Sequence, residues 1–178
     1  MKNIVINPFD SKSIQNAINE LNKYNSDLTK KCEQFVKELA DVGINVGRQN
    51  CGPYTNYIVF SKQVNPSKYG CTAIFCATNT GMITAEWQTK DGIKTADVNP
   101  ILMAEFGSGW YAEDMFDSGV GGQGTFPGQT HAFDSQWSWK DLNGELHSSR
   151  GEKPYHPMFN AYNEMFYQIR TIARRVFG

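Results

Sequence analysis

The sequence predicts an α+β domain in which a long N-terminal helix and a C-terminal helix pack on an antiparallel β-sheet. Three observations predict it: a heptad-spaced apolar pattern near the N-terminus, β-rich runs with turn residues between them, and a second helical pattern at the C-terminus. The chain has 178 residues, of which 40% are hydrophobic. It therefore has enough apolar sequence for one core, and we expect a single domain over 1–178. Disorder is excluded, because disordered chains combine low hydrophobicity with high net charge.

The first helix is predicted over 11–46, with Ser11 and Ser13 as candidate N-cap residues. Apolar residues then recur every seven positions in two series, Ile14, Leu21, Leu28, Phe35 and Val42, and Ile18, Cys32, Leu39 and Val46, with Asn25 at the remaining position of the second series. A seven-residue repeat is typical of one long helix with a narrow apolar seam.

This helix would be about 50 Å long at ~1.5 Å per residue, which is longer than a domain of this size needs. Its seam must be covered by the chain's own sheet or by another subunit. Asn25 either fixes the register of a helix pair or lies exposed where the seam leaves the core. Gly43 and Gly47 are expected to end or fray the helix.

An antiparallel meander of three or four strands is predicted over 57–98. The β-rich runs are Tyr57–Ser61, Cys71–Thr78, Met82–Gln88 and Ile93–Val98. Turn-forming residues separate them at Asn65-Pro66-Ser67, Asn79-Thr80-Gly81 and Asp91-Gly92. Asp91-Gly92 favours a two-residue hairpin turn.

After the predicted strands, the sequence predicts a short helix, a Gly-rich loop, a hairpin and a final helix. Asn99-Pro100 predicts an N-cap and a first helical proline, with the short helix ending at Gly107. A Gly-rich loop insertion is expected over 107–135, and a tryptophan hairpin around Asn143-Gly144 over 136–149. The final helix is predicted over 157–177, with its apolar positions facing the sheet at Phe159, Tyr162, Phe166, Ile169, Ala173 and Val176.

Charge and cysteine content restrict the function classes. The net charge is −1 and the pI is about 6.3, which disfavours a generic nucleic-acid binder, since such proteins carry a clustered basic excess. The segment 51–149 is acidic and 150–178 is basic, partly through Arg170, Arg174 and Arg175, which suit a helix C-terminus. The sequence lacks an apolar run long enough for a signal peptide or a membrane span. We therefore expect the four cysteines to be free thiols in a reducing compartment.

The sequence motifs that could indicate a nucleotide, metal or catalytic site are weak. Gly119–Gly124 matches G-x-G-x-x-G, but Pro127 and Gly128 follow it where a dinucleotide site needs a helix. His131, Asp134, His147 and His156 resemble metal ligands without the close spacing of a zinc site. Cys71 and Cys76 would point to opposite faces of one strand. No serine or cysteine lies in a nucleophile motif, so we expect no catalytic residues, cofactor or bound metal.

Aromatic residues around the Gly-rich loop indicate a binding surface or a satellite core. Trp137 and Trp139 share one face of a strand, and tryptophan is enriched at interface hot spots, while strands also favour aromatics for packing alone. The candidate interface consists of Trp110, Gly121, Gly122, Phe126, Trp137, Trp139, Arg170 and Arg174.

Two segments carry a resemblance to a known family. Ile101–Gly109, which reads ILMAEFGSG, and Pro157–Ala161 at the entry to the last helix resemble the neck or tail-completion proteins of long-tailed bacteriophages, which are head–tail connector or minor tail components. The order of elements is also similar, with Asn50–Pro53 as the Gly/Pro break. Ser108 replaces the family's usual threonine, and Gly119–Gln136 resembles an insertion found in prophages of Gram-positive bacteria.

The resemblance implies a structural virion protein without enzymatic activity, a ring subunit at the head–tail junction that is present in the host cytoplasm during assembly. Implied partners are further copies of the chain and neighbouring connector, head-completion, tail-terminator or tail-tube proteins, with no membrane and no sequence-specific nucleic acid. Glu105, Phe106 and Gly107 are expected to be structural, with Phe106 in the core and Gly107 ending the short helix. Two alternatives stay open: a metal-dependent hydrolase using His131, Asp134 and His147, and a cell-surface carbohydrate- or peptide-binding module using Trp137 and Trp139.

Overall fold

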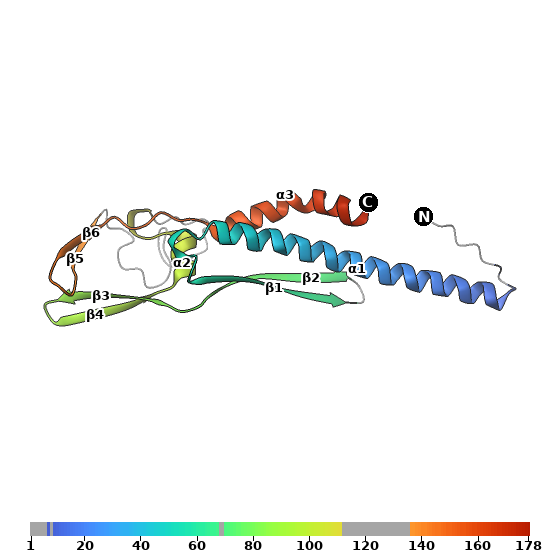
Figure 1. Ribbon diagram of the computed structural model, residues 1–178, viewed down its shortest axis with the longest axis horizontal. Coiled ribbons are helices and arrows are strands. Elements are labelled where there is room, and N and C mark those ends of the chain that lie inside the picture. Colours follow the sequence, from blue (N-terminus) through green and yellow to red (C-terminus); the bar gives the residue numbers. More distant parts are fainter. Residues whose placement is uncertain (1–6, 8, 68–69, 112–135) are drawn as a thin grey trace.

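The computed structural model describes residue 7 and residues 9–67, 70–111 and 136–178, and it has the predicted α+β architecture. The molecule is elongated (Figure 1). Helix α1 (Ser11–Gln49) runs along its middle, helix α3 (Pro157–Phe177) lies along one side of the C-terminal half of α1, and strands β1 and β2 lie along the other side. The N-terminal half of α1 projects beyond both.

Helix α1 is longer than predicted because its two glycines do not end it. It begins after Asp10, whose carboxylate accepts a hydrogen bond from the backbone N–H of Lys12 at 3.0 Å, so Asp10 rather than a serine is the N-cap. Gly43 and Gly47 are buried within the helix. A Cβ atom at Gly47 would lie 2.6 Å from the Phe60 ring, and one at Gly43 would lie 2.7 Å from Met165 Sδ. The glycines therefore let β1 and α3 approach the helix closely.

Strands β1 (Ile58–Ser67) and β2 (Gly70–Asn79) form a two-stranded antiparallel sheet against α1. Their register runs from Ile58↔Asn79 to Ser67↔Gly70. The turn expected at Asn65-Pro66-Ser67 is instead part of β1. Pro66 is tolerated because each strand of a two-stranded sheet is an edge strand, where a missing N–H costs little.

The other strands form a separate sheet, so the expected single meander is wrong. Its order is β4-β3-β5-β6, with β3 at Ile83–Thr89, β4 at Gly92–Val98, β5 at Trp137–Lys140 and β6 at Leu146–Ser149. A two-residue hairpin joins β3 and β4 as predicted, but the pairing Thr89↔Gly92 makes Lys90 and Asp91 its turn residues, one position earlier than Asp91-Gly92. Strands β3 and β5 join only at Gln88↔Lys140. Strand β3 therefore has β5 of the tryptophan hairpin as its second neighbour, whereas in the predicted meander that neighbour would have come from the β1–β2 part of the chain.

The core is small and lies where α1 ends. It consists of Cys51, Tyr54, Ile58, Phe60 and Ala104, from the α1 terminus, the 3-10 turn η1 (Gly52–Tyr54), β1 and helix α2 (Pro100–Phe106). Phe60 stacks on Phe75 with ring centroids 5.7 Å apart. The four cysteines are free thiols, as predicted.

Helix α2 begins as the sequence predicts. Asn99 is its N-cap and accepts hydrogen bonds from the N–H groups of Ile101 and Leu102. The helix ends at Gly107, where φ is 70° and ψ is −160°, a conformation essentially restricted to glycine. Phe106 is only half-buried, so its expected place in the core is wrong; the buried residues near this end are Ala104 and Glu105.

Candidate functional site

An apolar groove of about 280 Å³ lies where α1, α3 and β2 meet. Its lining is hydrophobic on all three elements: Val36, Leu39, Ala40, Ala73, Phe75, Tyr162, Met165, Phe166 and Ile169. The groove forms because α3 packs chiefly on α1, whereas β2 reaches α1 from the other side. Apolar side chains at such a junction favour contact with another apolar surface.

Helix α3 turns much of its predicted apolar stripe toward solvent. Its buried residues are Pro157, Ala161, Ile172 and Val176, so of the six positions expected to face the sheet only Val176 is buried. The face differs because α3 packs on α1, where the small Gly43 lies under Met165. Tyr162 and Phe166 are left 61% and 62% exposed at the edge of the groove.

Two arginines continue this exposed row. Tyr162, Phe166, Arg170 and Arg174 follow one another at intervals of four, so they lie along one face of the helix, and all four are exposed. Arg174 and Arg175 occupy the last turn, where positive charge is favourable. Arg175 reaches across to Glu38 on α1 at 2.5 Å. Arg170 and Arg174, both in the predicted interface, are thus placed beside exposed aromatic side chains.

The segments that carry the phage resemblance meet in space. The carboxylate of Glu105, at the end of α2, accepts hydrogen bonds from the backbone N–H groups of Met158 at 2.8 Å and Phe159 at 3.0 Å. It thereby caps the N-terminus of α3, where His156, the N-cap residue, makes no side-chain cap bond. The sequence missed this role of Glu105, although the unusual carboxylate in the apolar stretch ILMAEFG was a usable signal.

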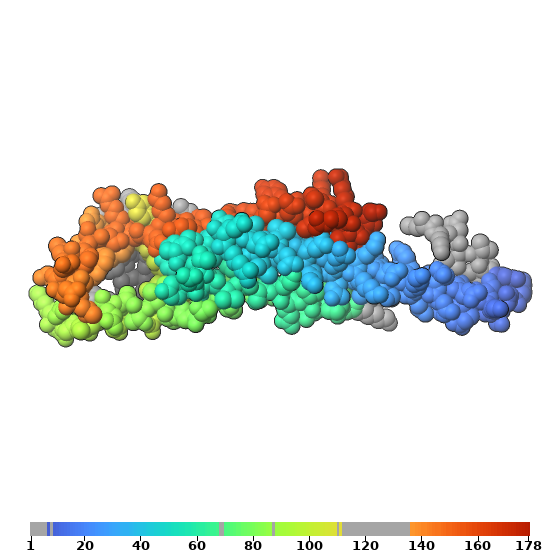
Figure 2. Space-filling view, viewed as in Figure 1, coloured from blue at the N-terminus to red at the C-terminus, as the bar shows by residue number. Residues whose placement is uncertain are grey.

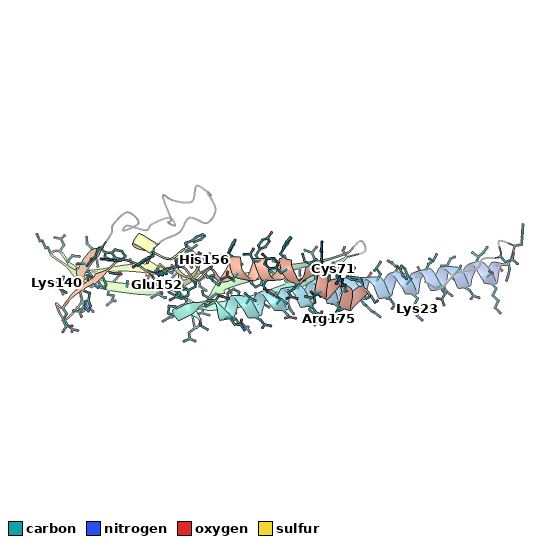
Figure 3. All side chains as sticks on the ribbon, turned by 90° about the horizontal axis from the view of Figure 1, so that it is seen from above. Lys23, Cys71, Lys140, Glu152, His156 and Arg175 are labelled. Carbon is teal, nitrogen blue, oxygen red and sulfur yellow. The ribbon has the colours of Figure 1, made fainter. Side chains whose placement is uncertain are left out.

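Polar contacts hold the connection between α2 and α3 in place. Ser108 and Glu152 exchange two backbone hydrogen bonds, at 2.8 and 3.2 Å. The hydroxyl of Tyr54 donates to the Glu152 carboxylate. Burial raises the pKa of Tyr54, and the hydrogen bond to Glu152 raises it further. Burial also raises the pKa of the Cys51 thiol, with a smaller contribution from Glu105, so Cys51 is a packing residue rather than a reactive thiolate. Figure 3 places Glu152 and His156 on this connection.

The tryptophan hairpin packs against its own chain. Trp137 and Trp139 share one face of β5, as predicted, and are half-buried. A Cβ atom at Gly109 would lie 2.7 Å from Trp137 Cη2, so this ring covers the Gly109 backbone. Trp139 stacks on His147 with centroids 5.5 Å apart. These contacts favour the satellite core over a stacking site for sugars.

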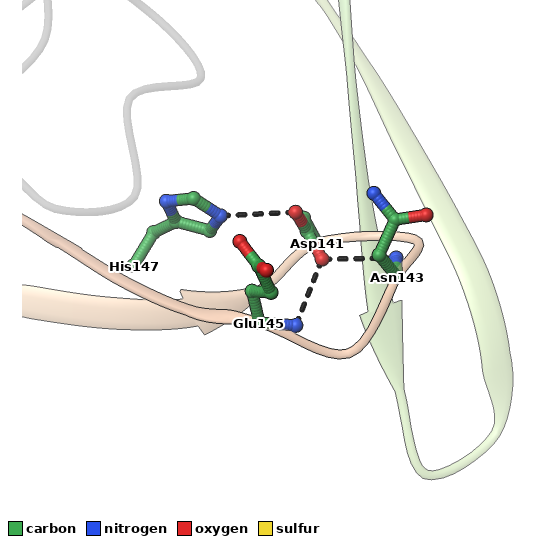
Figure 4. A network of polar contacts seen from close by, with 4 residues as sticks. All are labelled: Asp141, Asn143, Glu145 and His147. Atoms are coloured by element: carbon green, nitrogen blue, oxygen red, sulfur yellow. Dashed lines mark hydrogen bonds and ion pairs between the residues drawn. The ribbon is translucent and has the colours of Figure 1, made fainter.

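Asp141 and Glu145 of the β5–β6 turn and His147 of β6 form a polar cluster (Figure 4). Asp141 Oδ1 accepts hydrogen bonds from the N–H groups of Asn143 and Glu145, both at 2.9 Å, and Oδ2 lies 3.1 Å from His147 Nε2. The hydrogen bond to His147 is the main cause of the lowered pKa of Asp141. Three ligand atoms lie within 4.8 Å of one another, but the cluster is largely exposed and Asp141 already serves the turn.

Of the metal ligands in the hydrolase alternative, only His147 lies within the described residues. His147 has Asp141 and Glu145 as neighbours, while His131 and Asp134 lie outside the described residues. Asp141-Leu142-Asn143-Gly144 is a turn signal in its own right, because aspartate side chains accept hydrogen bonds from the N–H groups that follow. Gly121, Gly122 and Phe126 of the predicted interface also lie outside the described residues. Trp110 belongs to the 3-10 turn η2 (Gly109–Tyr111), and its side chain is not among those described.

Comparison with protein-family models finds no match, and neither the curated proteins nor the solved structures show a significant similarity to the chain. Within the described residues, no helix combines the length and the apolar character that crossing a membrane requires. The case for a function therefore rests on the chain's own surfaces and on the two segments that meet at Glu105.

Proposed function

We propose that this protein is a structural subunit of a bacteriophage virion, a ring component of the head–tail junction. The observation that carries the proposal is the apolar surface along α1 and α3, where side chains such as Leu21, at 55% exposed, and Phe166 are uncovered by the described residues. Patches of this kind mark protein–protein contacts, and a virion subunit makes such contacts on several sides. An elongated shape with a small core suits a protein that completes its burial in an assembly.

The more specific role at the neck is supported by the resemblance of Ile101–Gly109 and Pro157–Ala161. In the fold these segments form one unit, with Glu105 of the first capping the helix that the second begins. A carboxylate buried at a helix N-terminus is a structural device, in agreement with a non-enzymatic role for the motif. The partners of the proposal are other copies of the chain and the connector, head-completion, tail-terminator or tail-tube proteins.

Native mass spectrometry or mass photometry tests the proposal on the full chain, alone and with phage portal or tail-terminator proteins. A closed ring of three or more copies, or a stoichiometric complex with one of these proteins, is expected. Phe166→Ser should weaken the assembly, because it removes an exposed ring beside the groove, whereas Leu146→Ser, on exposed β6, should not. A protein that forms neither a ring nor a complex at any concentration would contradict the proposal.

A further inference from the structure

The apolar seam of α1 is covered along only part of its length. From Phe35 onward it packs against α3, β1 and β2. Between residues 11 and 31 its apolar seam residues are exposed, from 39% at Ile14 to 55% at Leu21. Figure 2 shows this part of α1 (blue) extending past the end of α3 (dark red). Three of its four exposed seam residues, Ile14, Leu21 and Leu28, belong to one seven-residue series, and the fourth, Ile18, belongs to the other.

Helix α3 ends at the point where the seam becomes uncovered. Phe177, its last residue, contacts Phe35 with ring centroids 5.7 Å apart, and Arg175 pairs with Glu38. Helix α3 starts near the C-terminal end of α1 and runs back along it, so the two helices are antiparallel (Figure 1). The covered half of the seam therefore already holds an antiparallel helix, and the same seam continues beyond it.

We propose that the projecting half of α1 pairs with the same segment of a second copy, antiparallel, so that the second copy's α1 begins where α3 ends. The segment 11–31 is about 30 Å long at ~1.5 Å per residue. Each copy contributes the same apolar positions, which makes the contact isologous and closed at two copies. It covers the exposed part of both seams in one step.

The continuity of α1 decides the orientation. A parallel partner in register would lie on the seam at residues 11–31 and then meet α3, which occupies that seam from Phe35. Helix α1 is unbroken to Gln49, so it cannot turn away at that point. In an antiparallel pair, the second copy's α1 begins at the end of α3. The rest of the second copy then lies beyond the N-terminus of the first copy's α1.

Charge favours the same arrangement. The C-terminal end of α3 carries Arg174 and Arg175, and the second copy's α1 would bring its N-cap, Asp10, beside it. The two helices would then follow one another with the negative end of one dipole next to the positive end of the other. Among the side chains that flank the seam in 11–31, only Lys31 is charged, and the others are Gln15, Ala17, Asn22, Tyr24 and Thr29. Asn25 is the single polar seam residue, the type that restricts register.

Sedimentation of the full chain tests the pairing. The wild type should have twice the mass of the Leu21→Glu variant at the same concentration, whether the α1 contact joins two monomers or two rings, and the variant should keep an unchanged circular dichroism spectrum. Leu142→Glu is the matched control, because Leu142 is also an exposed leucine, at 49%, but lies on the β5–β6 turn; it should remain a dimer. A monomeric wild type, or a dimer that survives Leu21→Glu, would overturn the proposal.

Disulfide cross-linking tests the orientation in a chain carrying Cys32→Ser, Cys71→Ser and Cys76→Ser, with buried Cys51 retained. Ile14→Cys and Leu28→Cys should each fail to cross-link alone and should cross-link to one another when the two variants are mixed. Cross-linking of each variant to itself would indicate a parallel pair and overturn the proposal. The pairing is independent of the proposed virion function, since a dimer that joins no phage protein would contradict that function and leave the pairing intact.

Discussion

Glu105 Oε2 accepts a hydrogen bond from the backbone N–H of Met158 at 2.8 Å, and this contact ties the end of α2 to the start of α3 across more than fifty residues of sequence. Glu105 is the only buried charged residue among those described. A carboxylate is expensive to bury unless it is hydrogen-bonded, and the two N–H groups of α3 satisfy it. The position of α3 on α1 therefore depends on one side chain of α2.

Removing this cap should destabilise the fold. Glu105→Ala is expected to lower the free energy of unfolding by about 1–3 kcal/mol, because it leaves two helix N–H groups without their acceptor. Glu105→Gln should cost less, since its carbonyl still accepts one bond. Urea unfolding measures both, with the exposed Glu86→Gln as the control. If Glu105→Ala unfolds at the wild-type urea concentration, the cap is not what holds α3.

The end of α2 depends on glycine for a backbone reason. Gly107 has φ 70° and ψ −160°, and a Cβ atom there would lie 2.8 Å from Pro154 N. Gly107→Ala should therefore reduce stability by about 1–3 kcal/mol. Gly81→Ala is the matched control, because a Cβ atom at Gly81 meets nothing within 4 Å. Thermal unfolding should give Gly107→Ala a lower melting temperature than Gly81→Ala. Equal melting temperatures would show that alanine at position 107 does not strain the backbone.

Alkaline pH should destabilise the protein through Tyr54. Burial and the bond to Glu152 raise its folded-state pKa above the unfolded value of about 10. The folded state therefore keeps a proton that the unfolded state loses, so stability is fully present below pH ~10 and declines as the pH rises further. Urea unfolding between pH 8 and 11 should show this decline, and Tyr54→Phe should flatten it. The exposed Tyr167→Phe should keep the wild-type decline; a flat wild-type profile would refute the assignment.

Much of the fold follows from local pattern, and the rest depends on which surfaces meet. The seven-residue repeat predicts α1, and Asn99-Pro100 predicts the start of α2, because both signals act within a few residues. The sheet arrangement was not predictable in this way: β3 pairs with β5 through Gln88↔Lys140, a contact between segments far apart in sequence. Gly43 and Gly47 were misjudged because their role depends on Met165 and Phe60.

The candidate site was predictable to a similar degree. Arg170 and Arg174 are exposed beside an aromatic row, and their place in an interface stays a prediction. Trp137 was identified correctly as an aromatic of the hairpin, but its contact with the Gly109 backbone joins two segments that no spacing rule connects. Glu105 was assigned a structural role through the resemblance, while its hydrogen bonds to α3 became visible only in three dimensions.

The β5–β6 turn should depend on the acceptor atoms of Asp141 rather than on a metal ion. Asp141→Ala removes the acceptor for the N–H groups of Asn143 and Glu145, whereas Asp141→Asn retains a carbonyl oxygen for them. Faster amide hydrogen exchange at Glu145 is expected in the first variant and near-wild-type exchange in the second. Both measurements use chelator-treated protein. Protection that requires added zinc would instead assign the cluster to metal binding.

The two buried glycines of α1 should respond oppositely to substitution by alanine. Alanine favours a helix over glycine by about 1 kcal/mol, so the outcome depends on what the new Cβ atom meets. At Gly47 it meets the ring of Phe60, which is buried and stacked on Phe75, and a rigid ring in a packed core cannot move without cost. At Gly43 it meets Met165, an unbranched side chain that adapts its shape. Urea unfolding should therefore show Gly47→Ala destabilised by about 1–3 kcal/mol and Gly43→Ala close to wild type or more stable. Equal losses in the two variants would mean that α3 fits against α1 as rigidly as β1 does.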